Sequence, residues 1–154
     1  MQITHLAGVG PVAAVIRSIG LRHDGAHHVL ASGDGLYLDL RRALRNPADN
    51  PALRYMTGLD GAVYEHVLAT PGAQELIAQT DVQLRAIADE VRRGRLVRLT
   101  VACQGGRHRS VAVAEAVARR TWGAWGGEYG VDVEHHYINH PVLPAPADPR
   151  PARP

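Results

Sequence analysis

The sequence predicts a single α/β domain in which a largely parallel sheet is flanked by helices. Apolar, β-branched segments of strand length alternate along the chain with longer segments of helical periodicity, which is the pattern of parallel strands joined by helical crossovers. The length of 154 residues is that of one ordinary domain. A composition of 45% hydrophobic and 21% charged residues is typical of a globular chain and excludes a wholly disordered one.

Four segments have the composition of strands. Residues 12–16, continued by residues 18–21, form an apolar run that ends in a glycine-bearing loop. Residues 35–40 alternate between apolar and polar side chains, as do residues 131–137 near the end of the chain. Residues 96–102 are rich in Leu, Val and Thr, so we expect them to form a buried strand.

Two short helices are expected between the strands of residues 35–40 and 96–102. The first covers residues 51–56, with Asn50 as its N-cap and Thr57-Gly58 as its end. Asp60 can cap the second, which runs to about residue 68.

Two further helices follow from apolar spacing. Residues 71–93 repeat apolar side chains at intervals of three and four, and Gly94 stops the pattern. Residues 110–121 form an alanine-rich helix that Gly123 and the glycines after it interrupt.

The remaining composition limits the class of protein. Residues 141–154 are proline-rich and are expected to form a loose tail, which leaves residues 1–140 as the globular body. No run of ~18 apolar residues could span a membrane, and residues 1–10 do not read as a signal peptide, so a cytoplasmic protein is expected. Cys103 is the only cysteine, which excludes an internal disulfide framework and a multi-cysteine zinc site.

All 17 basic residues are arginines, against 15 acidic residues and a formal net charge of +2. A guanidinium is a planar fork that matches phosphate and carboxylate groups. The charge balance therefore permits an anionic small molecule or a nucleic acid as partner, without requiring either.

The strongest local signal follows the predicted buried strand. A strand that runs through a glycine-bearing loop into a helix directs backbone N–H groups and the helix dipole at one point, which suits an anion. Arginine in such a loop can clamp phosphate oxygens through two hydrogen bonds. We therefore expect a phosphate-binding loop made of Cys103, Gln104, Gly105, Gly106, Arg107, His108, Arg109 and Ser110.

The same residues satisfy C-x-x-G-x-x-R-S, the phosphate loop of cysteine-dependent phosphatases. In that chemistry the thiolate attacks phosphorus while the helix N-terminus and the arginine lower the thiol pKa. Ala102 stands where those enzymes usually carry histidine, and neither Asp39 nor Asp60 has the usual surroundings of their general acid. A phosphatase with Cys103 as nucleophile is therefore kept as the alternative function.

Several motifs in order carry a family resemblance. The segment from Ala102 to Glu115, A-C-Q-G-G-R-H-R-S-V-x-x-A-E, resembles the C-T-G-G-K-H-R-S-V stretch of the C-terminal domain of the RapZ (RNase adapter) and YvcJ family. Residues 17–25, residues 38–47 (D-x-R…N-P) and residues 54–60 (R-x-x-T-G-x-D) are similar to three further family stretches, and residues 131–136 resemble its closing strand. The chain contains no G-x-x-x-x-G-K-[ST] motif, so the resemblance implies a stand-alone version of this domain without the family's P-loop kinase-like domain.

The resemblance implies a fold like part of phosphofructokinase and a phosphorylated amino sugar, glucosamine-6-phosphate, as ligand. The 103–110 loop would hold the phosphate or the sugar, Asp39 would accept hydrogens from hydroxyl or ammonium groups, and Arg54 and Thr57 would close the site. Asp39 ends a predicted parallel strand, and the carboxyl ends of such strands are where open α/β sheets place ligands, so we expect Asp39 and Cys103 at the same edge.

The family's enterobacterial members contact small regulatory RNA through basic residues. By resemblance, Arg17, Arg22, Arg41 and Arg42 are candidates for an RNA-binding surface, to which other arginines (Arg45, Arg107, Arg119 and Arg120) could add. A regulatory protein or a second copy of the chain are further expected partners, and no membrane partner is expected.

Histidine pairs at residues 27–28 and 135–136 do not indicate a metal site, because adjacent residues on a strand face opposite sides. Tyr55 is expected at a rim or in the core. No cofactor is expected. Taken together, these features predict a domain that binds a phosphorylated small molecule and acts as a sensor or adapter.

Overall fold

The computed structural model describes residues 1–31, 35–90 and 94–144. Its sheet has five strands in the order β1-β5-β2-β4-β3. The strands β5, β2, β4 and β3 run parallel to one another, and β1 pairs antiparallel with β5 at one edge. The strand bounds are β1 (Gln2–Leu6), β2 (Val12–Gly20), β3 (Gly35–Asp39), β4 (Val97–Cys103) and β5 (Gly130–His135). The predicted α/β class with a largely parallel sheet is confirmed.

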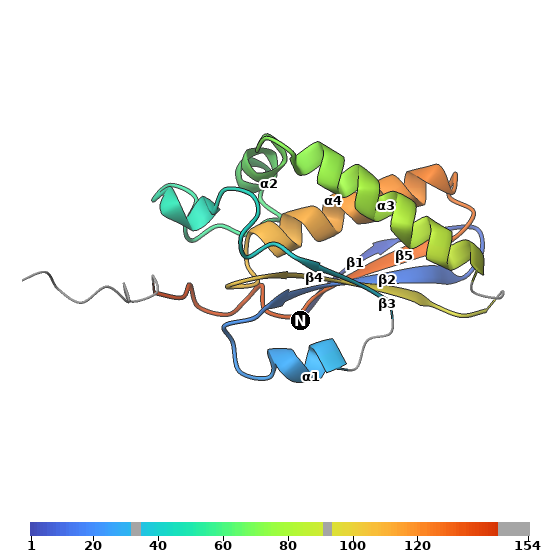
Figure 1. The fold of residues 1–154 in the computed structure, drawn as a ribbon, viewed down its shortest axis with the longest axis horizontal. Coiled ribbons are helices and arrows are strands. Elements are labelled where there is room, and N and C mark those ends of the chain that lie inside the picture. Colours follow the sequence, from blue (N-terminus) through green and yellow to red (C-terminus); the bar gives the residue numbers. More distant parts are fainter. Residues whose placement is uncertain (32–34, 91–93, 145–154) are drawn as a thin grey trace, which may run out of the picture.

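Helices cover both faces of the sheet, as Figure 1 shows. The short α1 (Ala26–Ala31) lies on one face, and α2 (Gly61–Leu68), α3 (Ala73–Glu90) and α4 (Arg109–Ala124) lie on the other. The side chains of β4 contribute to the apolar clusters on both faces of the sheet. Leu99 and Val101 of this strand pack into the large core under α2 to α4, whereas Ala102 belongs to a smaller cluster beside α1.

Most predicted elements lie where the sequence indicates them. The strands of residues 35–40, 96–102 and 131–137 and the helices ending near residues 68 and 93 correspond to β3, β4, β5, α2 and α3, while residues 91–93 lie outside the described residues. Asp60 is the N-cap residue of α2, but its carboxylate accepts from the Thr57 N–H instead of from the helix. The predicted break at Gly123 is wrong, because α4 continues to Ala124 and ends before the left-handed glycines 126 and 127.

The predicted helix over residues 51–56 is wrong. Residues 47–49 form one 3₁₀ turn, with the Asn46 side chain accepting from the Ala48 N–H, and residues 51–56 form turns. The carbonyl groups of Arg54, Tyr55 and Met56 accept hydrogen bonds from His108 and Arg107. These tertiary contacts replace the hydrogen bonds that a short, costly helix nucleus would need.

Two elements have no counterpart among the predictions. Strand β1 is an exposed edge strand with a weak apolar pattern, and α1 has only six residues after Gly25. Neither carries a long periodic signal, so both depend on the sheet that they pack against.

The carboxyl ends of β2, β4 and β3 meet at one edge of the sheet. The Leu21 N–H donates to the Cys103 carbonyl at 2.9 Å, and the Leu40 N–H donates to the Ala102 carbonyl at 2.7 Å. Gly106 has φ of +72°, and a Cβ there would lie 2.6 Å from the backbone N of Gly20. Only glycine allows this approach of the loop after β4 to the end of β2.

The predicted tail of residues 141–154 divides at residue 144. Residues 145–154 lie outside the described residues. Residues 141–144 form neither helix nor strand and lie against the carboxyl edge of the sheet, where they line a cleft. Among the helices described here, none is long and apolar enough to cross a membrane.

Candidate functional site

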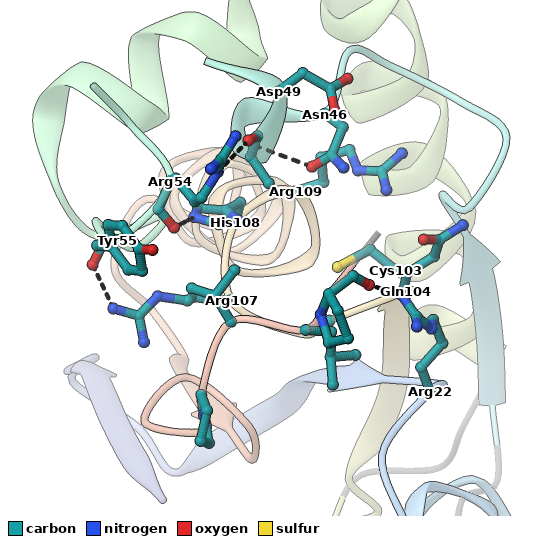
Figure 2. Close-up of a pocket in the computed structure, with 16 residues that line it drawn as sticks. Arg22, Asn46, Asp49, Arg54, Tyr55, Cys103, Gln104, Arg107, His108 and Arg109 are labelled. Atoms are coloured by element: carbon teal, nitrogen blue, oxygen red, sulfur yellow. Dashed lines mark hydrogen bonds between the residues drawn. The ribbon is translucent and has the colours of Figure 1, made fainter. Parts of the chain in front are cut away.

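A cleft of about 790 Å³ lies at the carboxyl edge of the sheet, beside the start of α4 (Figure 2). This volume falls within the range of roughly 300–1,000 Å³ that is typical of small-molecule sites. The loop after β4, the turns of residues 46–55, the chain after β2 and the segment after β5 contribute its lining. The lining residues are Arg22, Asn46, Ala48, Asp49, Arg54, Tyr55, Cys103, Gln104, Gly105, Arg107, His108, Arg109, Pro141, Val142, Leu143 and Pro144.

The lining is strongly basic. It contains four guanidinium groups, those of Arg22, Arg54, Arg107 and Arg109, against one carboxylate, that of Asp49. Guanidinium groups in a concave site concentrate positive potential and match the geometry of phosphate oxygens. The charges of the lining therefore favour an anion over a cation.

The loop after β4 is held by its own cysteine. The Gly106 N–H donates to Cys103 Sγ at 3.2 Å, and Cys103 Sγ donates to Ser110 Oγ at 3.2 Å. Cys103 is 3% exposed. Helix α4 then begins at Arg109, and the side chain of its N-cap residue, His108, accepts no hydrogen bond from the first turn of the helix.

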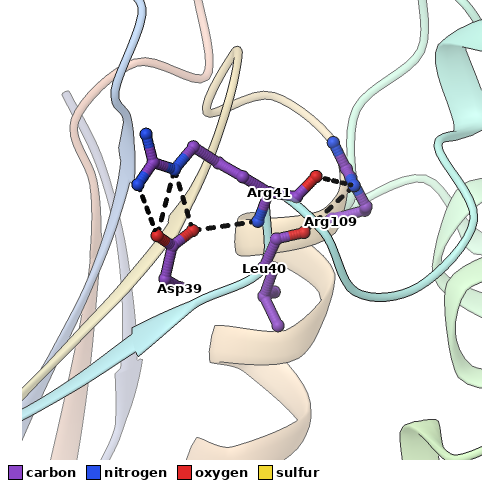
Figure 3. Close-up of polar contacts among 4 residues, drawn as sticks. All are labelled: Asp39, Leu40, Arg41 and Arg109. Atoms are coloured by element: carbon purple, nitrogen blue, oxygen red, sulfur yellow. Dashed lines mark hydrogen bonds and ion pairs between the residues drawn. The ribbon is translucent and has the colours of Figure 1, made fainter.

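Arg109 is anchored at one end of its guanidinium. Its Nη1 donates to the carbonyl group of Leu40 at 3.0 Å, which Figure 3 shows. It also donates to the Ala43 carbonyl at 3.2 Å, in the turn that follows β3. The part of the chain that the structure describes offers no hydrogen-bond partner to Nε or Nη2. Anchoring one nitrogen by neutral carbonyl groups fixes the guanidinium while its charge and its other donors stay available to a ligand.

Arg107 joins two distant segments of the lining. Its Nε donates to the Met56 carbonyl at 3.0 Å, and its Nη2 donates to the Tyr55 carbonyl. Its Nη1 donates to the Ile138 carbonyl at 3.2 Å. This one side chain therefore closes the cleft between the turn before α2 and the chain after β5.

His108 and Arg54 hold the same turn from the other side. Burial lowers the pKa of His108, so that its ring is neutral at pH 7 and Nε2–H donates to the Arg54 carbonyl at 3.0 Å. The Arg54 Nε donates to the Ala48 carbonyl at 3.0 Å. His108 thus acts in the structure as a donor to the backbone.

Asp39 lies at the expected edge but not in the cleft. Its carboxylate binds the Arg41 side chain, with 2.7 Å between Asp39 Oδ2 and Arg41 Nη2 (Figure 3), and hydrogen bonds from Arg41 lower the pKa of Asp39. It lines a second hollow of about 490 Å³ with Arg41, Arg42 and Gln104. Since Gln104 also lines the cleft, the two hollows adjoin, but the carboxylate inside the cleft is that of Asp49.

Three other expected site residues support the cleft without lining it. Gly106 and Ser110 are buried and bind the Cys103 sulfur, as described above. Thr57 shapes the turn before α2, where its hydroxyl accepts from the Leu59 N–H at 3.2 Å.

Three of the four arginines expected to form an RNA-binding surface line the two adjoining hollows, and the fourth does not. Arg17 lies on β2 with 6% of its surface exposed, so it does not contribute to such a surface, and burial lowers its pKa. Arg22 belongs to the cleft, whereas Arg41 and Arg42 are exposed at the second hollow.

Tyr55 was expected at a rim or in the core, and it lies at the rim of the cleft with 73% of its surface exposed.

Sequence reasoning missed part of the lining. Asn46 and Asp49 belong to the N-P motif and its turn, so that motif was the available signal. Residues 141–144 carried no signal, because a proline-rich segment looks the same whether it is free or held by tertiary contacts. Within residues 1–31, 35–90 and 94–144, no group of three or more potential metal ligands gathers.

Comparison with known proteins identifies the family of the chain. The family model of the RapZ C-terminal domain matches residues 13–139. A nucleotide-binding protein of Rubrobacter xylanophilus is 44% identical over 97 residues, which cover 61% of this chain and 32% of that protein. A nucleotide-binding protein of Mycobacterium sp. (strain KMS) is 36% identical over 129 residues, which cover 82% of this chain and 40% of that protein.

A nucleotide-binding protein of Parafrankia sp. is 48% identical over 81 residues, which cover 51% of this chain and 28% of that protein. The matched parts therefore make up 28% to 40% of the length of these three curated relatives. The family match covers both the loop of residues 103–110 and the turns of residues 46–55, which build the basic cleft. The chain belongs to the RapZ C-terminal domain family.

Proposed function

We propose that this chain binds a phosphorylated sugar, with glucosamine-6-phosphate as the reference compound, and serves as a regulatory sensor or adapter. The observation that carries the proposal is the convergence of four guanidinium groups and the uncapped start of α4 on one cleft. A phosphate dianion is the group that such donors bind best.

The single carboxylate in the cleft supports an amino sugar in particular. Asp49 lies among the arginines, and its carboxylate is exposed toward solvent. A ligand with a phosphate at one end and an ammonium group at the other would satisfy both kinds of charge at once. Glucose-6-phosphate, which lacks the ammonium group, is therefore the informative comparison.

The geometry favours binding over catalysis. The Cys103 sulfur is buried and engaged by Gly106 and Ser110. A phosphatase would need an exposed thiolate in line with phosphorus and a nearby general acid. The alternative keeps one supporting observation, which is that Cys103 does line the cleft.

Calorimetry tests the proposal. The purified chain is titrated with glucosamine-6-phosphate, glucose-6-phosphate and inorganic phosphate, and phosphate release is assayed on the same samples. We expect glucosamine-6-phosphate to bind more tightly than inorganic phosphate, by about tenfold or more, without release of phosphate. A chain that binds none of the three anions would contradict the proposal.

Cys103→Ser separates the two functions. Serine keeps a hydrogen-bonding group at the centre of the loop but is a much weaker nucleophile than a thiolate. A sensor should keep its affinity within a few-fold. Phosphate release by the unmodified chain that disappears in Cys103→Ser would establish the phosphatase instead.

A further inference from the structure

The chain after β5 forms a wall of the cleft. Residues 141–144, which we name the strap, all line it: Pro141, Val142, Leu143 and Pro144. The family match ends at residue 139, so this wall lies outside the part of the chain that the family shares. Val142 and Leu143 are half-buried, as expected for side chains that pack along a surface.

Two arginines of the cleft hold the strap at its ends. The Arg22 Nη1 donates to the Pro144 carbonyl at 3.0 Å. The Arg107 Nη1 donates to the Ile138 carbonyl at 3.2 Å and to the His140 carbonyl at 3.3 Å, directly before the strap. The strap is therefore attached to the same side chains that give the cleft its charge.

A ring cluster fixes the point where the strap begins. His23 stacks on Tyr137 with ring centroids 5.1 Å apart, and the His140 ring packs on each of them at 4.8 Å. His23 Nε2 also lies 2.9 Å from the carbonyl oxygen of Gly105, in the loop after β4. These contacts set the strap's position relative to the anion-binding loop.

The strap differs chemically from the rest of the lining. Its side chains are aliphatic, its two prolines lack N–H donors, and its backbone presents mainly carbonyl oxygens. It is a poor partner for phosphate oxygens. It is a suitable partner for hydroxyl groups, which can donate to carbonyl oxygens, and for the C–H surfaces of a carbon skeleton.

We propose that residues 141–144 hold the part of the ligand that is not phosphate, and so determine which phosphorylated polyol this chain selects. This inference rests on the proposed function. The arginines and the start of α4 supply affinity for any phosphate, whereas the strap supplies the preference for an organic phosphate over inorganic phosphate.

Two truncated chains test the proposal. One ends after Pro144 and keeps the strap, and the other ends after His140 and lacks it, and both carry a C-terminal amide so that no new carboxylate lies beside Arg22 or Arg107. Both are titrated with glucosamine-6-phosphate and with inorganic phosphate, and their melting temperatures are compared with that of the full chain. Loss of the strap should weaken binding of the sugar phosphate by about tenfold and leave inorganic phosphate within twofold, since only apolar and carbonyl contacts are removed. The chain that ends after Pro144 should match the full chain for both.

A double substitution in the full chain guards against misfolding of the shorter one. Val142→Ser with Leu143→Ser keeps the backbone and its anchors, and should lower the affinity for the sugar phosphate alone. Equal losses for both anions, an unchanged affinity or a tighter affinity for the sugar phosphate would each overturn the strap's role. A full chain that binds neither anion would instead refute the proposed function, and the role of the strap with it.

Discussion

Helix α4 contacts two polar regions whose charged groups have different partners. One is the basic cleft at its N-terminus, and the other is a buried chain of hydrogen-bonded side chains beneath its middle. In the buried chain, Ser18 Oγ lies 2.7 Å from His135 Nδ1, and His135 Nε2 lies 2.8 Å from Glu115 Oε1. All three residues are at most 2% exposed. The order Ser-His-Glu is that of a hydrolase triad, but no substrate can reach a serine with no exposed surface.

In the buried chain, Glu115 Oε1 is paired with His135 Nε2, and Glu115 Oε2 lies 3.6 Å from Arg119 Nη2. Burial raises the pKa of Glu115, but hydrogen bonds from His135 and Thr4 outweigh it and leave the pKa lowered, so the carboxylate is ionised at neutral pH. An ionised carboxylate only accepts, so His135 Nε2–H donates to it. The arrangement joins α4 to β5 and β2 and leaves little for a ligand to bind.

The cleft uses a different kind of partner. Arg22, Arg54, Arg107 and Arg109 all donate to backbone carbonyl groups, and none forms an ion pair within the part of the chain that the structure describes. Carbonyl oxygens fix a guanidinium without neutralising its charge. The difference teaches that charge is paired where it serves the fold and left without an ion-pair partner at the cleft, where we propose that a ligand binds.

The largest expected effect comes from breaking the buried chain. Glu115→Ala leaves the buried His135 without its acceptor, and should lower the free energy of unfolding by about 3–5 kcal/mol. Glu115→Gln, which keeps an accepting oxygen, should cost clearly less. Urea unfolding measures both. A loss below about 1 kcal/mol for the alanine variant would show that the buried pairing contributes little to stability.

Breaking the cleft should affect binding more than folding. Arg109→Ala removes the anchored guanidinium, and should weaken binding of glucosamine-6-phosphate by about 100-fold, as expected for a hydrogen-bonded charge. Calorimetry measures this change, with Arg95→Ala as a control that removes an exposed arginine outside the cleft lining. Equal affinities for the two variants would argue against the cleft as the anion site.

The smallest expected effect is on the pH dependence of the free energy of unfolding, which should distinguish the two regions. Unfolded His108 takes up a proton near pH 6.5, whereas burial lowers its pKa in the folded chain. Between the two values the unfolded chain binds more protons, so the free energy of unfolding should fall as the pH drops through 6.5, by at most about 1.4 kcal/mol per pH unit for this group. His23, whose pKa burial also lowers, contributes in the same direction.

Glu115 behaves differently, because its folded pKa lies below its ordinary value of 4.5. Its stabilising contribution is complete above pH 4.5 and is lost only below it. Urea unfolding at pH 7.5 and pH 5.5 should therefore report on His108 and His23 and not on Glu115. His108→Gln, which can still donate to the Arg54 carbonyl, should reduce the slope in this interval, and an unchanged slope would exclude His108 as its source.

Local patterns predicted most of the fold. The β-branched run of β4 and the three- and four-residue spacing of α3 each carry enough apolar repeats to determine an element and its buried face. The turns after Asn50 were predicted as a helix from local capping signals. In the folded chain, contacts from Arg107 and His108, which lie about 50 residues away in the sequence, decide their conformation instead.

The sequence by itself determined the loop that we propose as the anion site. Cys103, Gly106 and Arg109 lie between a buried strand and a helix, and the chemistry of that junction depends on neighbours in the chain. Their grouping into one loop therefore needed no knowledge of the remaining fold.

Only the tertiary structure decided what surrounds that loop. It buried Arg17 in β2, placed Asp49 in the cleft and brought residues 141–144 back to form a wall. The physical reason is that each outcome depends on which strands and turns lie side by side. That arrangement follows from packing the whole sheet and its helices, and no short stretch of the sequence contains it.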